Sequence, residues 1–118
     1  CQHMHSPTVD HFAEVKRLLR FVKGTIGHGL TYSPSSFDIH AYSDSNWAGD
    51  VSDRKSTSGY CIFLGSNLVS WSAKKQATVS RSSTEAEYRS LVHTAAELAW
   101  ISMLLTELSI ASPVPPTL

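Results

Sequence analysis

The chain has 118 residues, 42% of them hydrophobic, which is enough for one compact core and too few for several. Its ten Lys and Arg residues balance its ten Asp and Glu residues, so the formal net charge is zero. The overall charge therefore does not indicate a nucleic-acid partner, and any affinity for nucleic acid must come from local patches. Two cysteines, Cys1 and Cys61, exclude a disulfide framework and favour a reducing compartment. No stretch is apolar enough for a membrane span.

The first predicted element is an amphipathic helix. Apolar residues recur at helical spacing from Phe12 to Val22, after Pro7 and Thr8, and Gly24 is a natural stop. The other face carries four basic residues, which could lie along a phosphate backbone, although we favour a simply solvated face. These residues are Lys16, Arg17, Arg20 and Lys23.

Three strands are predicted next. The run 38–44 has strand character and ends in polar residues. The runs 60–64 and 68–72 are separated by Gly65-Ser66-Asn67, which predicts a β-hairpin. In that hairpin Cys61 is expected to be buried, and Trp71 is expected in the core.

A long helical pattern follows and ends near Ser109. Leu91, Ala95 and Leu98 are expected on one buried face, and Trp100 also reads as core. Trp47 stands apart from these elements in a loop, where it could pack on that loop or stack on a nucleotide.

Two carboxylates stand out against this background. Asp44 ends the first predicted strand, and Glu87 lies near the start of the long helix, one turn before Leu91. This spacing predicts that Glu87 faces the core, where a carboxylate is costly unless a cation compensates it. Carboxylate oxygens are the ligands that hard divalent cations prefer, so the pattern predicts a metal site formed by Asp44 and Glu87.

The neighbouring Glu85 has a structural explanation. Ser82 followed by Glu85 fits a capping box, which satisfies backbone amides at a helix amino terminus. Thr84 and Glu87 fit the same pattern shifted by two residues, which would exchange the roles of the two glutamates. We favour Glu87 as the metal ligand.

Several motifs resemble the ribonuclease H domain of copia-type retrotransposon Pol polyproteins. They are AYSDSNWAGD at 41–50, DRKSTSGY at 53–60, SWSAKKQ at 70–76 and SSTEAEY at 82–88, in the family's order. The resemblance implies a ribonuclease H-like α/β fold, a mixed sheet with covering helices that is incomplete here. Residues 1–36 would form a connector from the reverse transcriptase, and residues 37–118 the amino-terminal portion of the domain, with three strands and the long helix.

The resemblance also implies a chemistry. Members of the family hydrolyse the RNA strand of RNA/DNA hybrids with two divalent ions, Mg²⁺ or Mn²⁺, and Asp44 and Glu87 match two of their catalytic metal ligands. The third ligand is expected in a strand shortly beyond Leu118, and Glu107 is a poor substitute. The chain alone is therefore expected to bind metal weakly and to cleave slowly or not at all. Its implied partners are the hybrid and the reverse transcriptase of the same polyprotein, in a cytoplasmic particle or the nucleus, with no membrane.

Two polar segments are candidate hybrid-binding surfaces, with plain solvation an equal alternative. Asp50 and Asp53 lie beside the first segment, and a solvated turn is their favoured role. The nine candidate residues are Arg54, Lys55, Ser56, Thr57 and Ser58 in the first segment, and Lys74, Lys75, Gln76 and Arg81 in the second.

Other readings compete with the nuclease. Cys1, His3, His5 and His11 crowd the amino end, but their spacing matches no usual zinc pattern, and no Gly-x-Ser-x-Gly turn supports a serine hydrolase. A non-catalytic hybrid-binding module or a relic without present function would retain the same motifs. The Cys1 start and the proline-rich segment 113–118 indicate a piece of a longer polypeptide, whose open strand edge is expected to promote association.

Overall fold

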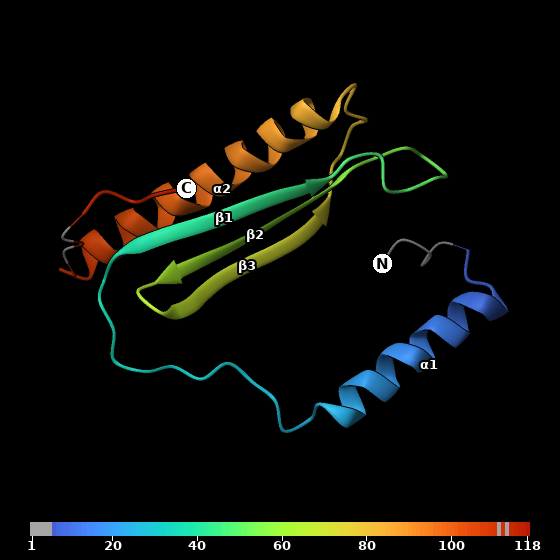
Figure 1. Ribbon diagram of the computed structural model, residues 1–118, viewed down its shortest axis with the longest axis horizontal. Helices are drawn as coiled ribbons and strands as arrows, with labels where there is room; N and C mark the ends of the chain where they lie inside the picture. The colour runs from blue at the N-terminus through green and yellow to red at the C-terminus, as the bar shows by residue number, and fades with distance from the viewer. Residues whose placement is uncertain (1–5, 111, 113) are drawn as a thin grey trace. The chain divides into compact units, whose positions relative to one another are not determined.

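The computed structural model describes residues 6–110, 112 and 114–118, and its α/β fold divides into two compact units, one ending at Thr31 and the other beginning at Tyr32. The smaller unit contains α1 (Val9–Gly24). The larger contains β1 (Ile39–Asn46), β2 (Thr57–Leu64), β3 (Asn67–Lys75) and α2 (Ser83–Glu107) (Figure 1). Among the described residues, neither helix has the length and apolar character that crossing a membrane requires.

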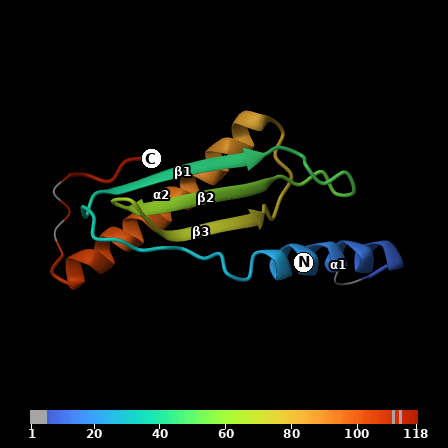
Figure 2. The same ribbon diagram turned by 60° about the horizontal axis from the view of Figure 1, so that its bottom comes forward.

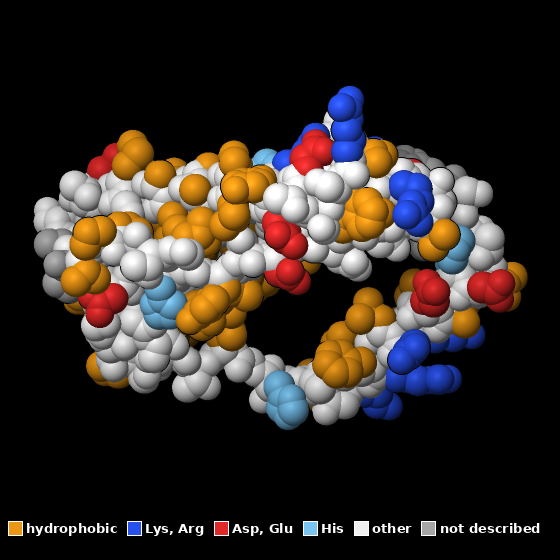
Figure 3. Space-filling view, turned by 45° about the horizontal axis from the view of Figure 1, so that its top comes forward, with side chains coloured by type: hydrophobic (Ala, Val, Ile, Leu, Met, Phe, Trp, Pro, Cys, Tyr) orange, Lys and Arg blue, Asp and Glu red, His pale blue; other side chains and the backbone are white. Residues whose placement is uncertain are grey.

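Helix α1 confirms the first predicted element. Thr8 is its N-cap, with its side chain accepting from the backbone N–H of His11, and its own N–H donates to His11 Nδ1 at 3.1 Å. None of its residues is buried, and Figure 3 shows hydrophobic side chains on one side of it and basic ones on the other. The basic residues of this helix are exposed, which leaves both solvation and phosphate contact open to them. Of the four residues whose spacing disfavours a zinc site, Cys1, His3 and His5 lie outside the described residues.

The three strands form an antiparallel sheet in the order β1-β2-β3, which confirms the predicted hairpin. Asp44 on β1 lies opposite Gly59 on β2, and Cys61 lies opposite Trp71 on β3. The hairpin turns at Gly65, whose φ of +57° lies in the left-handed region that glycine tolerates best. Cys61 is only half-buried, so its expected burial is wrong.

Helix α2 covers one face of the sheet (Figures 1 and 2). The core lies between them, because alternate residues of a strand point to one face and every third or fourth residue of a helix to one side. It consists of Ile39, Ala41, Ile62, Leu98, Ile101 and Leu105. Trp71 and Trp100 are 58% and 57% exposed, so their predicted core positions are wrong. Trp71 pairs with Cys61 on the sheet face that α2 does not cover, and Trp100 lies outside the buried row of α2.

The free edge of β1 is partly covered by residues near the carboxyl end. Thr117 forms a parallel bridge with His40, and its carbonyl oxygen accepts from the N–H of Ala41 at 2.9 Å. The N–H of Thr117 donates in turn to the carbonyl oxygen of Ile39 at 3.1 Å. The expected open edge is therefore correct only for the later part of β1, where no strand pairing on this side is found among the described residues.

Candidate functional site

Asp44 lies near the end of β1, as the sequence predicted, and it is exposed to solvent. Ile39 and Ala41 point to the α2 side, so the alternation of the strand places Asp44 on the opposite face. Its backbone partner on β2 is Gly59, which has no side chain to crowd the carboxylate. The Oγ of Ser90 on α2 donates to the carbonyl oxygen of Asp44 at 2.8 Å, which fixes this point of the strand to the helix.

Glu87 lies on α2 but not on its buried side, so its predicted core-facing position is wrong. The buried row of the helix runs through Ala86, Ser90, Thr94 and Leu98, whereas Glu87 is exposed. Leu91 and Ala95, which were predicted on the buried face, are exposed as well. The argument that burial of Glu87 demands a cation therefore does not apply. A metal role for Glu87 must depend on its position relative to Asp44.

That position follows from the two flanks of α2. On one flank Arg89 bonds to Thr78, and Glu97 accepts from Ser70 of β3 at 3.1 Å, so this flank faces β3. Because helix residues advance by about 100° each, Glu87 lies on the other flank, on the side of β1. It also lies one turn before the hydrogen bond from Ser90 to Asp44.

The backbones of Asp44 and Glu87 therefore lie in neighbouring parts of β1 and α2, although the side chain of Asp44 is on the sheet face that α2 does not cover. Neither carboxylate takes part in an ion pair among the described residues. Their oxygen donors suit a hard divalent cation. In the described part of the chain, however, no group of three or more His, Cys, Asp or Glu side chains is placed to hold a metal ion. Asp44 and Glu87 alone are therefore too few to form a complete metal site.

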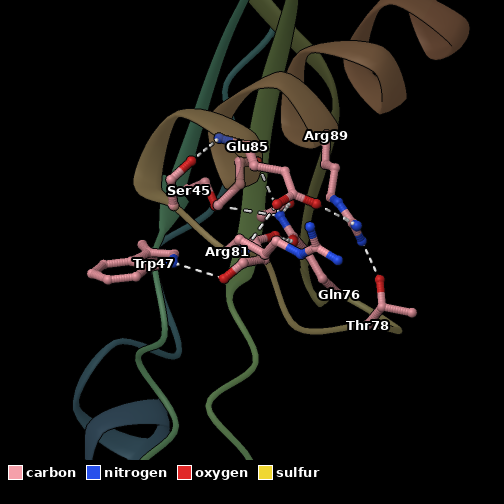
Figure 4. Close-up of polar contacts among 11 residues, drawn as sticks. Ser45, Trp47, Gln76, Thr78, Arg81, Glu85 and Arg89 are labelled. Carbon is pink, nitrogen blue, oxygen red and sulfur yellow. Dashed lines mark hydrogen bonds and ion pairs between the residues drawn. The ribbon is translucent and has the colours of Figure 1, made fainter.

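Glu85 has a structural role at the start of α2, as the sequence predicted, but its capping box is only half formed, because its carboxylate accepts from Arg81 rather than from the N-cap Ser82 (Figure 4). Ser82 is the N-cap of α2 and accepts from the N–H of Glu85 at 3.1 Å. The Glu85 carboxylate accepts from the N–H of Arg81 at 2.8 Å and pairs with Arg89 at 2.7 Å, and these contacts, the Arg81 one foremost, hold the pKa of Glu85 below its usual value. The shifted capping box of Thr84 and Glu87 is not formed, since α2 begins after Ser82.

Asp50 and Asp53 are anchored rather than simply solvated. Their carboxylates lie 2.5 Å and 2.8 Å from Nζ of Lys75, and the side chain of Asp50 is only 15% exposed. The hydrogen bond from Lys75 lowers the pKa of both carboxyl groups, and hydrogen bonds from Ser52 lower that of Asp50 further. The two carboxylates in turn raise the pKa of Lys75, Asp50 more than Asp53. The charge of Lys75 is thus balanced within the protein, which weakens its case as a phosphate contact.

Two other candidate hybrid-binding residues are buried and serve the fold. Ser56 is fully buried, and its Oγ accepts from the N–H of Ala48 at 3.1 Å. Gln76 is 8% exposed, and its Nε2 donates to Ser58 Oγ at 2.9 Å and to the Ala86 carbonyl at 3.0 Å. As the structure stands, neither side chain is accessible to a nucleic acid, and Ser58 is engaged by Gln76.

The remaining candidates divide by exposure. Arg54, Lys74 and Arg81 are exposed, while Lys55 and Thr57 are half-buried. Trp47 is 44% exposed and donates from Nε1 to the carbonyl of Ser80 at 3.0 Å, which fits the prediction of packing on a loop.

Sequence reasoning missed the polar residues that join α2 to the sheet. Ser90 and Thr94 are among the most buried side chains of the chain. Their spacing of four residues, in line with Ala86 and Leu98, was an available signal, but small polar residues rarely identify a buried row.

The fold and these residues define a small α/β segment with two candidate ligands for a divalent ion. The chain is 52% identical over 118 residues to the retrovirus-related Pol polyprotein from transposon RE2 of Arabidopsis thaliana, a match that covers 99% of this chain and 8% of the polyprotein. It is 59% identical over 103 residues to an uncharacterized mitochondrial protein of the same plant, covering 86% of this chain and 43% of that protein.

A third relative is close to the chain in length. It is the secreted RxLR effector protein 161 of Plasmopara viticola, 41% identical over 103 residues that cover 86% of this chain and 72% of the relative. No protein-family model and no solved structure matches the chain. The chain is therefore homologous to a segment of retrotransposon Pol polyproteins, and it spans only 8% of the length of the polyprotein that it matches.

Proposed function

We propose that the chain is the amino-terminal portion of a ribonuclease H domain in a copia-type retrotransposon Pol polyprotein. In this proposal the complete domain hydrolyses the RNA strand of RNA/DNA hybrids with Mg²⁺ or Mn²⁺, and its reverse transcriptase precedes it in the polyprotein. The observation that carries the proposal is the hydrogen bond from Ser90 to the carbonyl oxygen of Asp44, which holds the end of α2 that contains Glu87 against β1. The end-to-end match to a Pol polyprotein supplies the context.

The parallel bridge at Thr117 supports the proposal that a longer polyprotein supplies a third metal ligand. Thr117 lies opposite His40, and Asp44 follows His40 by four residues. A parallel strand continuing from Thr117 would therefore bring the residue four positions later opposite Asp44. A carboxylate there would stand beside Asp44, on the side of β1 towards which Glu87 is turned.

The roles of the residues follow from this arrangement. Asp44 and Glu87 would hold divalent ions through their carboxylate oxygens, and the exposed Arg54, Lys74 and Arg81 are available to contact hybrid phosphates. When bound, two such ions activate a water molecule and stabilise the attacking and leaving oxygens of the phosphodiester. We place the activity in a cytoplasmic retrotransposon particle or in the nucleus.

The test is cleavage of a labelled RNA/DNA hybrid in Mg²⁺ by the source reading frame extended past Leu118, beside the 118-residue chain. The extended protein should cleave, and Asp44→Asn and Glu87→Gln should each abolish cleavage. Glu107→Gln is the matched control, because Glu107 ends α2 at the opposite end from Glu87. A folded extension that binds the hybrid without cleaving it would overturn the nuclease and support a binding module.

A further inference from the structure

A buried polar network lies where α2 begins above the sheet (Figure 4). Its centre is Gln76, which donates to the carbonyl of Ala86 in α2 and to Ser58 in β2, while its Oε1 accepts from Ser80 Oγ at 2.7 Å. Ser45 on β1 is a longer contact of Gln76 Nε2 at 3.4 Å. One side chain therefore connects β1, β2, α2 and the segment that leads into α2.

Ser90 makes a second connection one helical turn after Glu87. Its Oγ lies 2.8 Å from the carbonyl oxygen of Asp44 and 3.3 Å from that of Gly59, and its residue is 1% exposed. A hydroxyl has one proton to donate, so the shorter contact to Asp44 is the stronger. Neither Ser90 nor Gln76 has a recorded bond to the carboxylate of Asp44 or Glu87.

The two halves of α2 are held in different ways. Leu98, Ile101 and Leu105 in its second half pack against the apolar core, a contact that is insensitive to direction. In its first half the buried positions are Ala86, Ser90 and Thr94, with no large apolar side chain. Hydrogen bonds with defined lengths and angles therefore set where this half lies on the sheet.

We propose that Gln76 and Ser90 are positioning residues, which fix the backbones that carry Asp44 and Glu87 relative to each other so that the two carboxylates can share a divalent ion. This inference rests on the proposed metal role of these two carboxylates. Ion–oxygen distances are confined to about 2.0–2.6 Å, so a small shift of the first half of α2 would remove one ligand from reach. The second half of α2 would remain docked.

The test uses Mn²⁺ alone as the probe and needs no catalysis. Mn²⁺ broadens the NMR signals of amides near its binding site, so titration of the 118-residue chain gives its affinity at positions 44 and 87. Ser90→Ala and Gln76→Met should each weaken Mn²⁺ binding by about tenfold or more, as supporting residues around metal ligands do. Ser70→Ala is the matched control, because it removes another bond from the sheet to α2, to Glu97 on the β3 flank, and should leave the affinity unchanged.

The outcomes separate this inference from the proposed function. If Asp44→Asn abolishes the broadening while folded Ser90→Ala and Gln76→Met retain the original affinity, the positioning role is wrong and the metal pair stands. If the original chain and Asp44→Asn respond to Mn²⁺ alike, the metal pair fails and the positioning role falls with it. Should Gln76→Met fail to fold, Ser90→Ala decides the question, since it only removes one oxygen atom.

Discussion

The segment that enters the sheet is held to the tip of the β2–β3 hairpin, and Gly65 makes that contact possible. The side-chain amide of Asn67 donates to the carbonyl oxygen of Ser33 and accepts from its N–H, both at 2.9 Å. Ser35 Oγ accepts from the N–H of Ser66 at 2.9 Å, and the N–H of Gly65 donates to the carbonyl of Asp38 at 2.8 Å. The start of the larger unit is thus fixed before β1 begins.

Gly65→Ala should break this contact for two reasons. An alanine in the left-handed region costs about 1–2 kcal/mol. Its Cβ would also lie 2.5 Å from the backbone oxygen of Ser36 and 2.3 Å from Ser35 Oγ. Rotating Ser35 away would give up its bond from Ser66, worth about 1 kcal/mol. The sum predicts a loss of about 2–3 kcal/mol in the free energy of unfolding, a large share of the 5–15 kcal/mol typical of a domain.

Urea unfolding followed by circular dichroism measures this loss, and amide hydrogen exchange at Ser66 reports opening of the contact itself. Gly59→Ala is the control, since a Cβ there would meet only the backbone oxygen of Ser72 at an ordinary 3.5 Å. It should change the free energy of unfolding by less than about 0.5 kcal/mol. A Gly65→Ala chain as stable as the original, with Ser66 still protected, would refute the reasoning.

Three further predictions follow from the same structure. Because the pKa values of Asp50 and Asp53 are lowered in the fold, their ion pairs stabilise the folded chain above the usual Asp pKa near 4, and this stabilisation is lost progressively as pH falls below that value. Thermal melts from pH 7 to pH 3 should therefore show a falling melting temperature, and Lys75→Met should reduce the fall. An equal fall in that variant would count against the ion pairs. Ser82→Ala should lower the free energy of unfolding by about 1 kcal/mol through loss of the N-cap, whereas Thr84→Ala, within the exposed first turn, should be nearly neutral in the same urea assay. The unpaired later part of β1 should cause concentration-dependent association of the chain in sedimentation experiments, and a monomer at every concentration would contradict this.

Elements whose patterns carry one dominant signal were predictable from the sequence. The strands and the hairpin turn at Gly65 follow from apolar runs broken by turn residues, and α2 begins at the N-cap that the sequence identifies, Ser82. Asp44 could be placed at a strand end for the same reason. These features depend on neighbouring residues alone.

The orientation of α2 was not predictable, because its buried row is set by packing. The apolar Leu91 predicts a buried face that would also include Glu87. In the structure the smaller Ala86, Ser90 and Thr94 pack against the sheet instead. Gln76 was misjudged for a related reason. A polar side chain reads as surface in a sequence, and only the folded chain shows four partners gathered around it.

The distribution of charge gives a separate reason to connect hybrid binding with a metal ion. Lys75 is balanced by Asp50 and Asp53, and Arg89 by Glu85, so the structure uses these cations internally. Asp44 and Glu87 are left exposed without an ion-pair partner among the described residues. A phosphodiester approaching two such carboxylates would be repelled, and the nearby exposed arginines and lysines lie on other segments. Under the proposed function, a divalent cation bound by these carboxylates would reverse the sign of this interaction and allow a phosphodiester to approach them.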